Sequence, residues 1–438
     1  MRPSSTTSPV YAEVTDLSHD GRGVARIDGK AVFVTGALPG ERARVRLARR
    51  HRSFDEAIVE ELLRVSPDRV EPVCAHFGTC AGCVLQHLSS GAQVAAKQRI
   101  LRENFERIGK IEPESWLAPL TGQPWGYRRK GRLSVKWVAK KDRIVVGFRE
   151  TNARFVADLA SCHTLLPAVG RRIEALAGMI GTLEAKRAIA QIEIAAGDES
   201  VALVFRHLSP LSEVDRATLA AFGRSHDLAI LLQPGGPDSV QPLWPPTAPV
   251  LSFRVEDIEF RFQPLDFVQV NAGMNRRMIA RVLELLDPQP DDRVLDLFCG
   301  LGNFSLPIAR RVAAVTGVEG DAGLVARARE NADRNGIRNV EFVAADLGVE
   351  QRAARFAQPA ASDKMLLDPP RSGAATLLDY LPHEAIRRVV YVSCHPGSLA
   401  RDAATLVKRH GFRLAAAGIM DMFAHTAHVE SIALFERD

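Results

Sequence analysis

The sequence predicts an α/β protein with three parts: a small N-terminal β-barrel, a central α+β domain that carries a metal cluster, and a C-terminal doubly wound domain. Short β-prone segments separated by glycine turns fill residues 10–66. Four of the six cysteines fall in one pattern within residues 67–262. Strand-like and helix-like segments alternate through residues 263–438, which is typical of a parallel sheet with helices on both faces.

The composition is that of a globular protein with a mildly basic surface. Of the 438 residues, 46% are hydrophobic and 25% are charged, and the net charge is +5. This charge permits a nucleic-acid partner without proving one. No run approaches about 18 apolar residues, and residues 1–9 have no apolar core of the signal-peptide kind. We therefore expect a cytoplasmic protein with no membrane partner and with a disordered tail at residues 1–9.

Residues 10–66 are expected to form an OB-like β-barrel, because short alternating strands are separated by turns that contain glycine. Arg42, Arg44 and Arg46 follow one another at a period of two. This spacing places three guanidinium groups on one strand face. Such a face can bind an RNA backbone, although charged edge strands also serve to block aggregation.

Residues 67–262 open with Cys74, Cys80 and Cys83, and Cys162 follows far downstream. In a cytosolic chain, clustered cysteines more often bind metal or do chemistry than form disulfides. Four thiolates can bind zinc tetrahedrally or hold an iron–sulfur cluster. From ligand type alone zinc is the safer choice, and either metal would staple two distant segments together.

The rest of the central region predicts helices and strands in mixed order, with a second candidate RNA surface at residues 127–132, where basic side chains surround an aromatic one. The expected elements are a helix over 92–108, strands at 131–137, 145–148, 191–195 and 201–205, a helix near 171–180 and a loop or linker at 234–246. In the C-terminal domain we expect helices over 275–286 and 322–335 and strands at 293–298, 313–318, 340–344, 364–367 and 389–393.

A glycine-containing turn at residues 296–304 follows the first C-terminal strand and precedes a helix. Glycines at such a turn let the backbone approach a ligand at the carboxyl ends of the strands. A lone Gly-x-Gly is weak evidence, and a dinucleotide is an alternative ligand. Glu319 at the end of the second strand can bind both ribose hydroxyls, and Asp346 after the third is placed to meet an adenine amino group. Together these features resemble the class I methyltransferase fold, which is Rossmann-like.

Two further motifs deliver reactive groups to the same edge of the sheet. Asp368 lies in an Asp-Pro-Pro-Arg loop whose prolines stiffen the backbone. Cys394 follows the last predicted strand and is our candidate nucleophile, with a pKa that should be lowered because the thiolate is the reactive form. Glu430 is a late acid in an apolar setting and is our candidate base. Cys299 has no role of its own beyond packing in the glycine turn.

Taken together, these residues resemble the bacterial 23S ribosomal RNA uracil-5-methyltransferases over nearly the whole chain. The resemblance implies that residues 10–66 are a TRAM domain, and that residues 67–262 and 263–438 are an iron–sulfur domain and a methyltransferase domain. It implies S-adenosylmethionine as methyl donor, 23S ribosomal RNA as partner and a monomeric enzyme. It also changes the metal from zinc to a [4Fe-4S] cluster at Cys74, Cys80, Cys83 and Cys162.

The same resemblance assigns the site. Cys394 falls on the nucleophile that adds to carbon 6 of uracil, which makes carbon 5 reactive enough to accept the methyl group. Glu430 falls on the base that then removes the carbon-5 proton. The residues that the resemblance places around S-adenosylmethionine are Gln269, Phe298, Asn303, Glu319, Asp346 and Asp368.

The sequence departs from the family pattern at two positions. His395 stands where asparagine is usual after the nucleophile, and Asp346 occupies a position that can be asparagine. The alternatives are an enzyme acting on transfer RNA or another ribosomal uridine, an amino-group methyltransferase, and a non-catalytic iron–sulfur RNA-binding protein. The Asp-Pro-Pro-Arg loop and Cys394 argue against the second alternative. The third leaves Cys394 and Glu430 unexplained.

Overall fold

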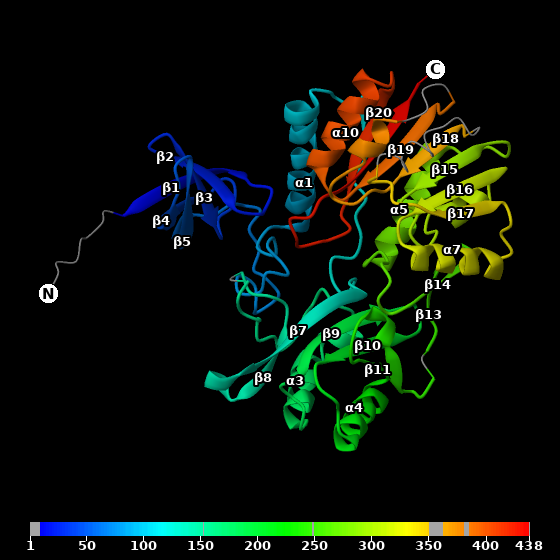
Figure 1. Ribbon diagram of the computed structural model, residues 1–438. Helices are drawn as coiled ribbons and strands as arrows, with labels where there is room; N and C mark the ends of the chain where they lie inside the picture. The colour runs from blue at the N-terminus through cyan, green and yellow to red at the C-terminus, as the bar shows by residue number, and fades with distance from the viewer. Residues whose placement is uncertain (1–8, 152, 248, 350–361, 381–384, 438) are drawn as a thin grey trace.

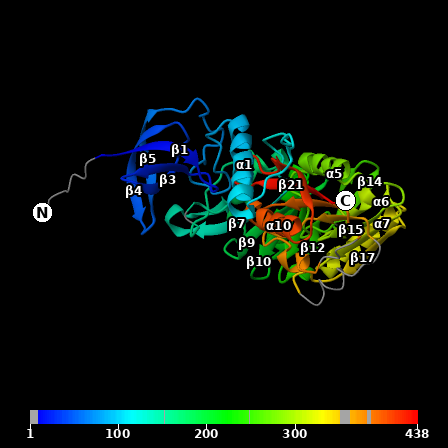
Figure 2. The ribbon, with the colours of Figure 1, turned by 90° about the horizontal axis from the view of Figure 1, so that it is seen from above.

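The structure is a computed structural model that describes residues 9–151, 153–247, 249–349, 362–380 and 385–437. Three bodies surround a long helix, α1 (Ser90–Asn104), which stands between the N-terminal barrel and the C-terminal sheet (Figure 1). The view from above shows the same order of barrel, helix and sheet (Figure 2). Nearly all of the tail expected at residues 1–9 lies outside the described residues. No helix in the described ranges is long and apolar enough to cross a membrane.

The N-terminal body is a closed five-stranded barrel with strand order β1-β2-β3-β5-β4. Alternate small apolar side chains such as Val14, Val32 and Val45 fill its interior, as the period-two pattern predicts. The barrel therefore confirms the expected fold of this region. Its strands are β1 (Val10–Leu17), β2 (Gly23–Ile27), β3 (Lys30–Thr35), β4 (Arg42–Arg50) and β5 (Phe54–Arg64).

The central body is a six-stranded sheet with strand order β12-β11-β10-β9-β7-β8, and helices cover one of its faces. The segment 234–246, which we expected to be a loop or linker, contains the edge strand β12, so that part of the prediction is wrong. β12 pairs antiparallel with β11. The elements are β7 (Lys130–Val138), β8 (Arg143–Gly147), α2 (Pro167–Gly170), α3 (Ile173–Thr182), β9 (Ile189–Ala196), β10 (Val201–His207), α4 (Glu213–His226), β11 (Ala229–Gln233) and β12 (Gln241–Trp244).

The C-terminal body is an eight-stranded sheet with strand order β17-β16-β15-β18-β19-β21-β20-β6. Its first five strands are parallel, while β21 runs antiparallel to both of its neighbours. The order reverses between β15 and β18, which is where open α/β sheets bind ligands. The strands are β6 (Ser115–Trp116), β15 (Arg293–Leu297), β16 (Ala314–Glu319), β17 (Val340–Ala344), β18 (Lys364–Leu367), β19 (Arg388–Ser393), β20 (Arg413–Met420) and β21 (Glu430–Glu436).

Both faces of this sheet are covered by helices, as the sequence predicts. Val294 and Val390 belong to the core under α5, α6 and α7, whereas Leu295 and Tyr391 belong to the core under α1, α9 and α10. Neighbouring residues of one strand point to opposite faces, so each strand is buried on both sides. The helices are α5 (Ala272–Leu286), α6 (Ser305–Ala309), α7 (Ala322–Arg334), α9 (Ala375–Leu378) and α10 (Pro396–Lys408).

Two segments that precede the C-terminal sheet in sequence pack onto it. β6 comes from inside the region expected to form the central domain, yet it pairs with β20 at the sheet edge. Helix α1 packs against α10 and β20 and continues into a π-helical turn at Phe105–Gly109. A hairpin of β13 (Leu251–Val255) and β14 (Ile258–Phe262), which the sequence did not suggest, packs against α7.

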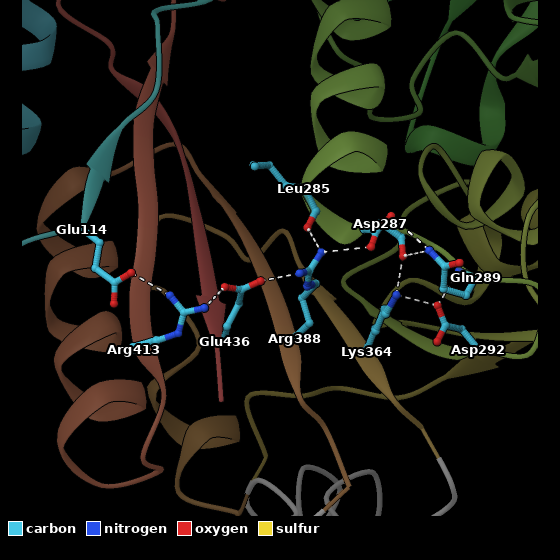
Figure 3. A network of polar contacts seen from close by, with 9 residues as sticks. All are labelled: Glu114, Leu285, Asp287, Gln289, Asp292, Lys364, Arg388, Arg413 and Glu436. Atoms are coloured by element: carbon cyan, nitrogen blue, oxygen red, sulfur yellow. Dashed lines mark hydrogen bonds and ion pairs between the residues drawn. The ribbon is translucent and has the colours of Figure 1, made fainter. Parts of the chain in front are cut away.

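A chain of charged side chains ties the strands together at the edge opposite the parallel strands' carboxyl ends (Figure 3). Arg388 begins β19 and pairs with Glu436 at the end of β21, and Glu436 also pairs with Arg413 at the start of β20. The carboxyl ends of the parallel strands lie at the opposite edge, away from this network. Its members are Glu114, Leu285, Asp287, Gln289, Asp292, Lys364, Arg388, Arg413 and Glu436.

Candidate active site

The carboxyl ends of the parallel strands bring most of the sequence-predicted site residues to one edge of the sheet. The glycine turn follows β15, Glu319 is the last residue of β16, and Asp368 directly follows β18. Cys394 directly follows β19, and Glu430 is the first residue of the antiparallel strand β21. Because β19 and β21 pair with Ser393 opposite Ser431, the nucleophile and base candidates lie on adjacent strand ends.

The glycine turn wraps around the Glu319 carboxylate. Gly300 and Gly302 adopt left-handed conformations with φ of +56° and +88°, which favours glycine at both positions. The Gly300 N–H donates to Glu319 Oε2 at 3.0 Å, and the Asp321 N–H donates to Oε1 at 3.0 Å. Each carboxylate oxygen keeps a further acceptor site. Glu319 can therefore accept from ribose hydroxyls while the backbone fixes its position.

Two residues with amide side chains, Asn303 and Gln269, are held in place in different ways. Asn303 exchanges two hydrogen bonds of 2.9 Å with Asn275 of α5. Gln269 is fixed through its backbone, because its carbonyl oxygen accepts from Nε of the buried Arg129 at 2.9 Å. The Arg129 N–H also donates to the Val270 carbonyl at 2.9 Å. The central body thus holds the segment that enters the C-terminal domain.

One acidic residue of the turn carried no role in the sequence analysis. Asp296, at the end of β15, is fully buried and accepts from the Ser305 hydroxyl at 2.5 Å. Its other oxygen, Oδ1, has no hydrogen-bond partner within the described ranges, and burial raises its pKa to about 7. The signal that could have found it is the acid that begins the segment 296–304 with its glycine turn. By contrast, Asp346 is exposed and accepts from the Gly348 N–H at 2.9 Å.

The Cys394 thiol lies among acidic groups, and its pKa is raised to about 11. Burial is the main cause, the nearby carboxylates of Glu430 and Asp368 add to it, and the guanidinium of Arg371 opposes them. The expectation of a lowered pKa is therefore wrong in this structure. A thiol with this pKa is protonated at neutral pH, so forming the thiolate requires a proton acceptor close by.

Glu430 is buried and its pKa is raised to about 7, because burial outweighs the favourable charges of Lys97 and Arg371. Burial also raises the pKa of Asp368 well above its usual value, and the Glu430 carboxylate adds to this rise. A carboxyl group with a pKa of about 7 is suited to exchanging a proton near neutral pH. Glu430 can therefore take a proton from a bound substrate.

The loop that carries Asp368 and Arg371 is attached to helix α10. Asp402 of α10 is buried, and its Oδ2 accepts from the Tyr391 hydroxyl at 2.6 Å and from the Ala374 N–H at 2.7 Å. One carboxylate oxygen therefore ties strand β19, which delivers Cys394, to the loop that delivers Asp368. The relative position of the two reactive groups depends on this contact.

The four patterned cysteines line one cavity of about 490 Å³, which Arg371 of the active-site loop also lines. Burial raises the pKa of Cys80 to about 11 and of Cys83 to about 12, and electrostatic repulsion between these groups and the neighbouring Cys162 adds to both. The topology thus brings the distant Cys162 to the N-terminal cysteines. Within the described ranges, no group of three or more His, Cys, Asp or Glu residues is placed to hold a metal ion.

Comparison with known proteins identifies the family to which this chain belongs. Residues 248–438 match the family model described as tRNA (Uracil-5-)-methyltransferase, and residues 9–59 match the TRAM domain. A protein of Xanthomonas axonopodis pv. citri, named 23S rRNA (uracil(1939)-C(5))-methyltransferase RlmD, is 59% identical over 98% of both chains. The protein of the same name from Stenotrophomonas maltophilia is also 59% identical over 98% of both chains. This chain belongs to the RlmD family of 23S rRNA (uracil-C5)-methyltransferases.

The fold of this RlmD-family chain also matches a solved structure. The Pyrococcus abyssi tRNA (uracil-54, C5)-methyltransferase, solved in complex with S-adenosyl-L-homocysteine, superposes with a TM-score of 0.73 at 24% sequence identity. The match covers 97% of this chain and 100% of that one. The similarity confirms the arrangement of the C-terminal domain as a methyltransferase fold.

The arginines expected to form an RNA-binding face of the TRAM barrel share one strand, but glutamates of the barrel neutralise them. Arg44 lies 3.1 Å from Glu61, Arg46 lies 3.6 Å from Glu60, and Arg42 lies 3.4 Å from Glu13. These exposed pairs contribute little to stability. A phosphate backbone would have to compete with the glutamates for these arginines.

His395, which departs from the family pattern, caps helix α10 as an asparagine could. Its Nδ1 accepts from the Ser398 N–H at 3.1 Å, and burial lowers its pKa, which keeps the ring neutral. We expect His395→Asn to keep the cap, whereas His395→Ala should lose about 1 kcal/mol of unfolding free energy. Chemical denaturation of both variants at pH 8 measures this. Equal losses in the two variants would contradict a capping role.

Proposed function

We propose that this chain transfers the methyl group of S-adenosylmethionine to carbon 5 of a uridine in 23S ribosomal RNA, with Cys394 as nucleophile and Glu430 as base. The observation that supports the two roles best is their proximity. The charges of Glu430 and Asp368 act directly on the Cys394 thiol at the edge where the glycine turn opens. The names of the close relatives specify uridine 1939, and we propose the equivalent uridine as the target.

The methyl donor would occupy the pocket around the glycine turn. The candidates to hold it are Gln269, Phe298, Asn303, Glu319, Asp346 and Asp368. The acidic ends of β16 and β17 and the open backbone of Gly300 fit a ligand with ribose hydroxyls and an adenine ring. When bound, S-adenosylmethionine supplies an electrophilic methyl group. The unpartnered Oδ1 of Asp296 points to this residue as a further polar contact for the donor.

The reaction on the uridine then needs two residues of this chain. The Cys394 thiol first loses its proton to solvent. The thiolate sulfur then adds to carbon 6, and the electron pair of the double bond makes carbon 5 nucleophilic enough to accept the methyl group. Glu430 next takes the proton from carbon 5, the double bond forms again, and the bond between carbon 6 and sulfur breaks. Asp368 is suited to accept from the uracil N–H or to orient the donor.

We further propose that Cys74, Cys80, Cys83 and Cys162 hold a [4Fe-4S] cluster. Their four thiols share one cavity, and thiolates are the ligands that iron–sulfur clusters take. Four thiolates could also bind a tetrahedral zinc ion, and the choice of a cluster over zinc rests on the family resemblance. Its role would be to staple residues 74–83 to the segment around Cys162.

Replacing Cys83 by serine is expected to remove the cluster and to lower the thermal stability of the chain, because the staple between two distant segments is lost. The measurement is iron and sulfide content with the visible spectrum, after anaerobic purification of the wild type and the variant. Cys299→Ser serves as control and should keep its iron. A colourless wild-type protein that contains zinc and no iron would contradict the cluster.

The substrate is tested with purified enzyme, labelled S-adenosylmethionine and two RNAs, a 23S ribosomal RNA fragment and unmodified transfer RNA. We expect label in the ribosomal fragment alone, at the uridine equivalent to 1939. Label in transfer RNA would favour the second candidate function, which the family model's description suggests. A cytoplasmic location and a monomeric state stay predictions that follow from the proposed substrate and the family resemblance.

A further inference from the structure

Helix α1 buries two polar side chains one turn apart. Gln93 is 2% exposed and Lys97 is 1% exposed. Burying an amide or an ammonium group is costly unless each finds partners. Both side chains find them in residues 421–428, the segment that joins β20 to Glu430 at the start of β21. A helix that precedes the methyltransferase domain in sequence therefore holds the approach to its candidate base.

Gln93 connects this segment to the end of the cysteine region. Its Nε2 donates to the Leu85 and Leu88 carbonyls at 3.0 and 2.8 Å, and its Oε1 accepts from the His425 N–H at 2.9 Å. The His425 carbonyl in turn accepts from the N–H groups of Val84 and Leu85 at 2.9 and 3.0 Å.

His425 adopts a left-handed conformation with φ of 66°, which a non-glycine residue keeps only when its surroundings hold it. Its ring stacks on Trp125 with the ring centres 3.8 Å apart. The contacts to Gln93 and Trp125 therefore fix the turn that leads to Glu430.

Lys97 holds the other end of the segment. Its Nζ lies 2.7 Å from Asp421 Oδ1 and 3.0 Å from the Phe423 carbonyl. Asp421 leaves β20 directly after Met420, which pairs with Glu430 across the strands. The ammonium group thus sits beside the first residue of β21, and its charge favours the ionised form of Glu430.

Three other titratable groups interact electrostatically with Glu430. Arg371 affects the pKa of Glu430, and the Glu430 carboxylate affects the pKa values of Asp368 and Cys394. Arg371 also favours the ionised carboxylate, but it is exposed, and solvent screens its charge. Lys97 is buried, so its charge acts more strongly at a given distance. Removing Lys97 therefore withdraws the main buried charge that keeps Glu430 ready to accept a proton.

We propose that Gln93 and Lys97 are positioning residues for the proton-abstraction half of the reaction, holding residues 421–428 and the Glu430 carboxylate in place. This inference rests on the proposed roles of Cys394 and Glu430. In that step the bond between carbon 5 and hydrogen breaks, and the proton passes to Glu430. The electron pair of the broken bond between carbon 5 and hydrogen forms the double bond between carbons 5 and 6, and Cys394 leaves as a thiolate. Addition of Cys394 and methyl transfer precede this step and do not require Glu430 as a base.

The test uses the full-length chain with Lys97→Met, Lys97→Arg and Gln93→Leu, and with the exposed Arg107→Met as matched control. Single-turnover assays with an ordinary uridine RNA measure methyl transfer, product release and the fraction of RNA bound covalently on a denaturing gel. We expect Lys97→Met and Gln93→Leu to slow release about 10- to 100-fold and to accumulate covalent RNA. Methyl transfer should change less than about threefold in both variants, and Arg107→Met should match the wild type.

The pH profile of release separates the two residues. In Lys97→Met the midpoint should move to higher pH, because a lost neighbouring cation disfavours the carboxylate. In Lys97→Arg and Gln93→Leu it should stay near that of the wild type. If Lys97→Met does not fold, the inference is tested by the other two variants. It then requires slow release in Gln93→Leu and a pH midpoint of release in Lys97→Arg that matches the wild type. Equal slowing of transfer and release without covalent RNA would overturn the inference, whereas a wild type that never binds 5-fluorouridine RNA covalently would overturn the proposed function.

Discussion

Replacing Cys394 by alanine is expected to abolish methyl transfer, with a fall in kcat on the order of 10⁶-fold, as for other enzymes that lose a covalent nucleophile. Without the sulfur, no bond to carbon 6 forms, and carbon 5 of the uracil stays too weak a nucleophile to take the methyl group. The measurement is the transfer of labelled methyl groups from S-adenosylmethionine to a 23S ribosomal RNA fragment.

The control for this variant is ligand binding. Cys394 is half-buried and directly follows β19, and alanine removes only its sulfur atom, so the variant should bind S-adenosylmethionine with an affinity close to that of the wild type. Cys394→Ser should be nearly as inactive, because a hydroxyl is much less nucleophilic than a thiol. Methyl transfer by Cys394→Ala at a tenth of the wild-type rate would contradict the nucleophile assignment.

Replacing Glu430 by glutamine should block the second half of the reaction rather than the first. The amide keeps the size of the side chain but cannot take a proton, so release should slow by about 10²- to 10⁴-fold. The methylated RNA should then stay bound to the protein and appear as a slowly migrating band on a denaturing gel. Turnover without any such band would contradict the role of Glu430 as the base.

The pH dependence of the wild type should separate the two steps. Glu430 acts as a base only when ionised, and its pKa is about 7, so release should slow as the pH falls through 7 and level off above it. The pKa of Cys394 is about 11, so adduct formation should keep rising with pH well beyond that point. Rapid-quench measurements between pH 6 and 9 would resolve both profiles. In Glu430→Gln the change in the release rate near pH 7 should disappear.

The sequence predicts the site well where strand ends determine it. Glu319, Asp368 and Cys394 each follow or end a strand of the same parallel sheet, and the carboxyl ends of parallel strands meet at one edge. The spacing of the motifs along the chain was therefore enough to bring these side chains together. The same reasoning could not place Glu430, which was a candidate only as a late acid in an apolar setting, because it begins an antiparallel strand whose position no parallel pattern fixes.

Contacts between distant segments could not be predicted in this way. The sequence of α1 predicts a helix, but it does not predict that Lys97 is buried against Asp421, which lies near the other end of the chain. The raised pKa of Cys394 has the same origin, because it depends on how closely Glu430 and Asp368 approach in three dimensions. The ion pairs of the barrel arginines arise from the pairing of β4 with β5 and with β1, which the arginine spacing alone does not reveal.

The most direct test of the central claim is to trap the covalent complex. The enzyme is incubated with S-adenosylmethionine and a 23S ribosomal RNA fragment in which uridine is replaced by 5-fluorouridine, whose fluorine cannot be removed as a proton. We predict a denaturation-resistant complex that peptide mass spectrometry maps to Cys394. A complex that persists in Cys394→Ala, or no complex from enzyme that methylates ordinary RNA, would contradict the account.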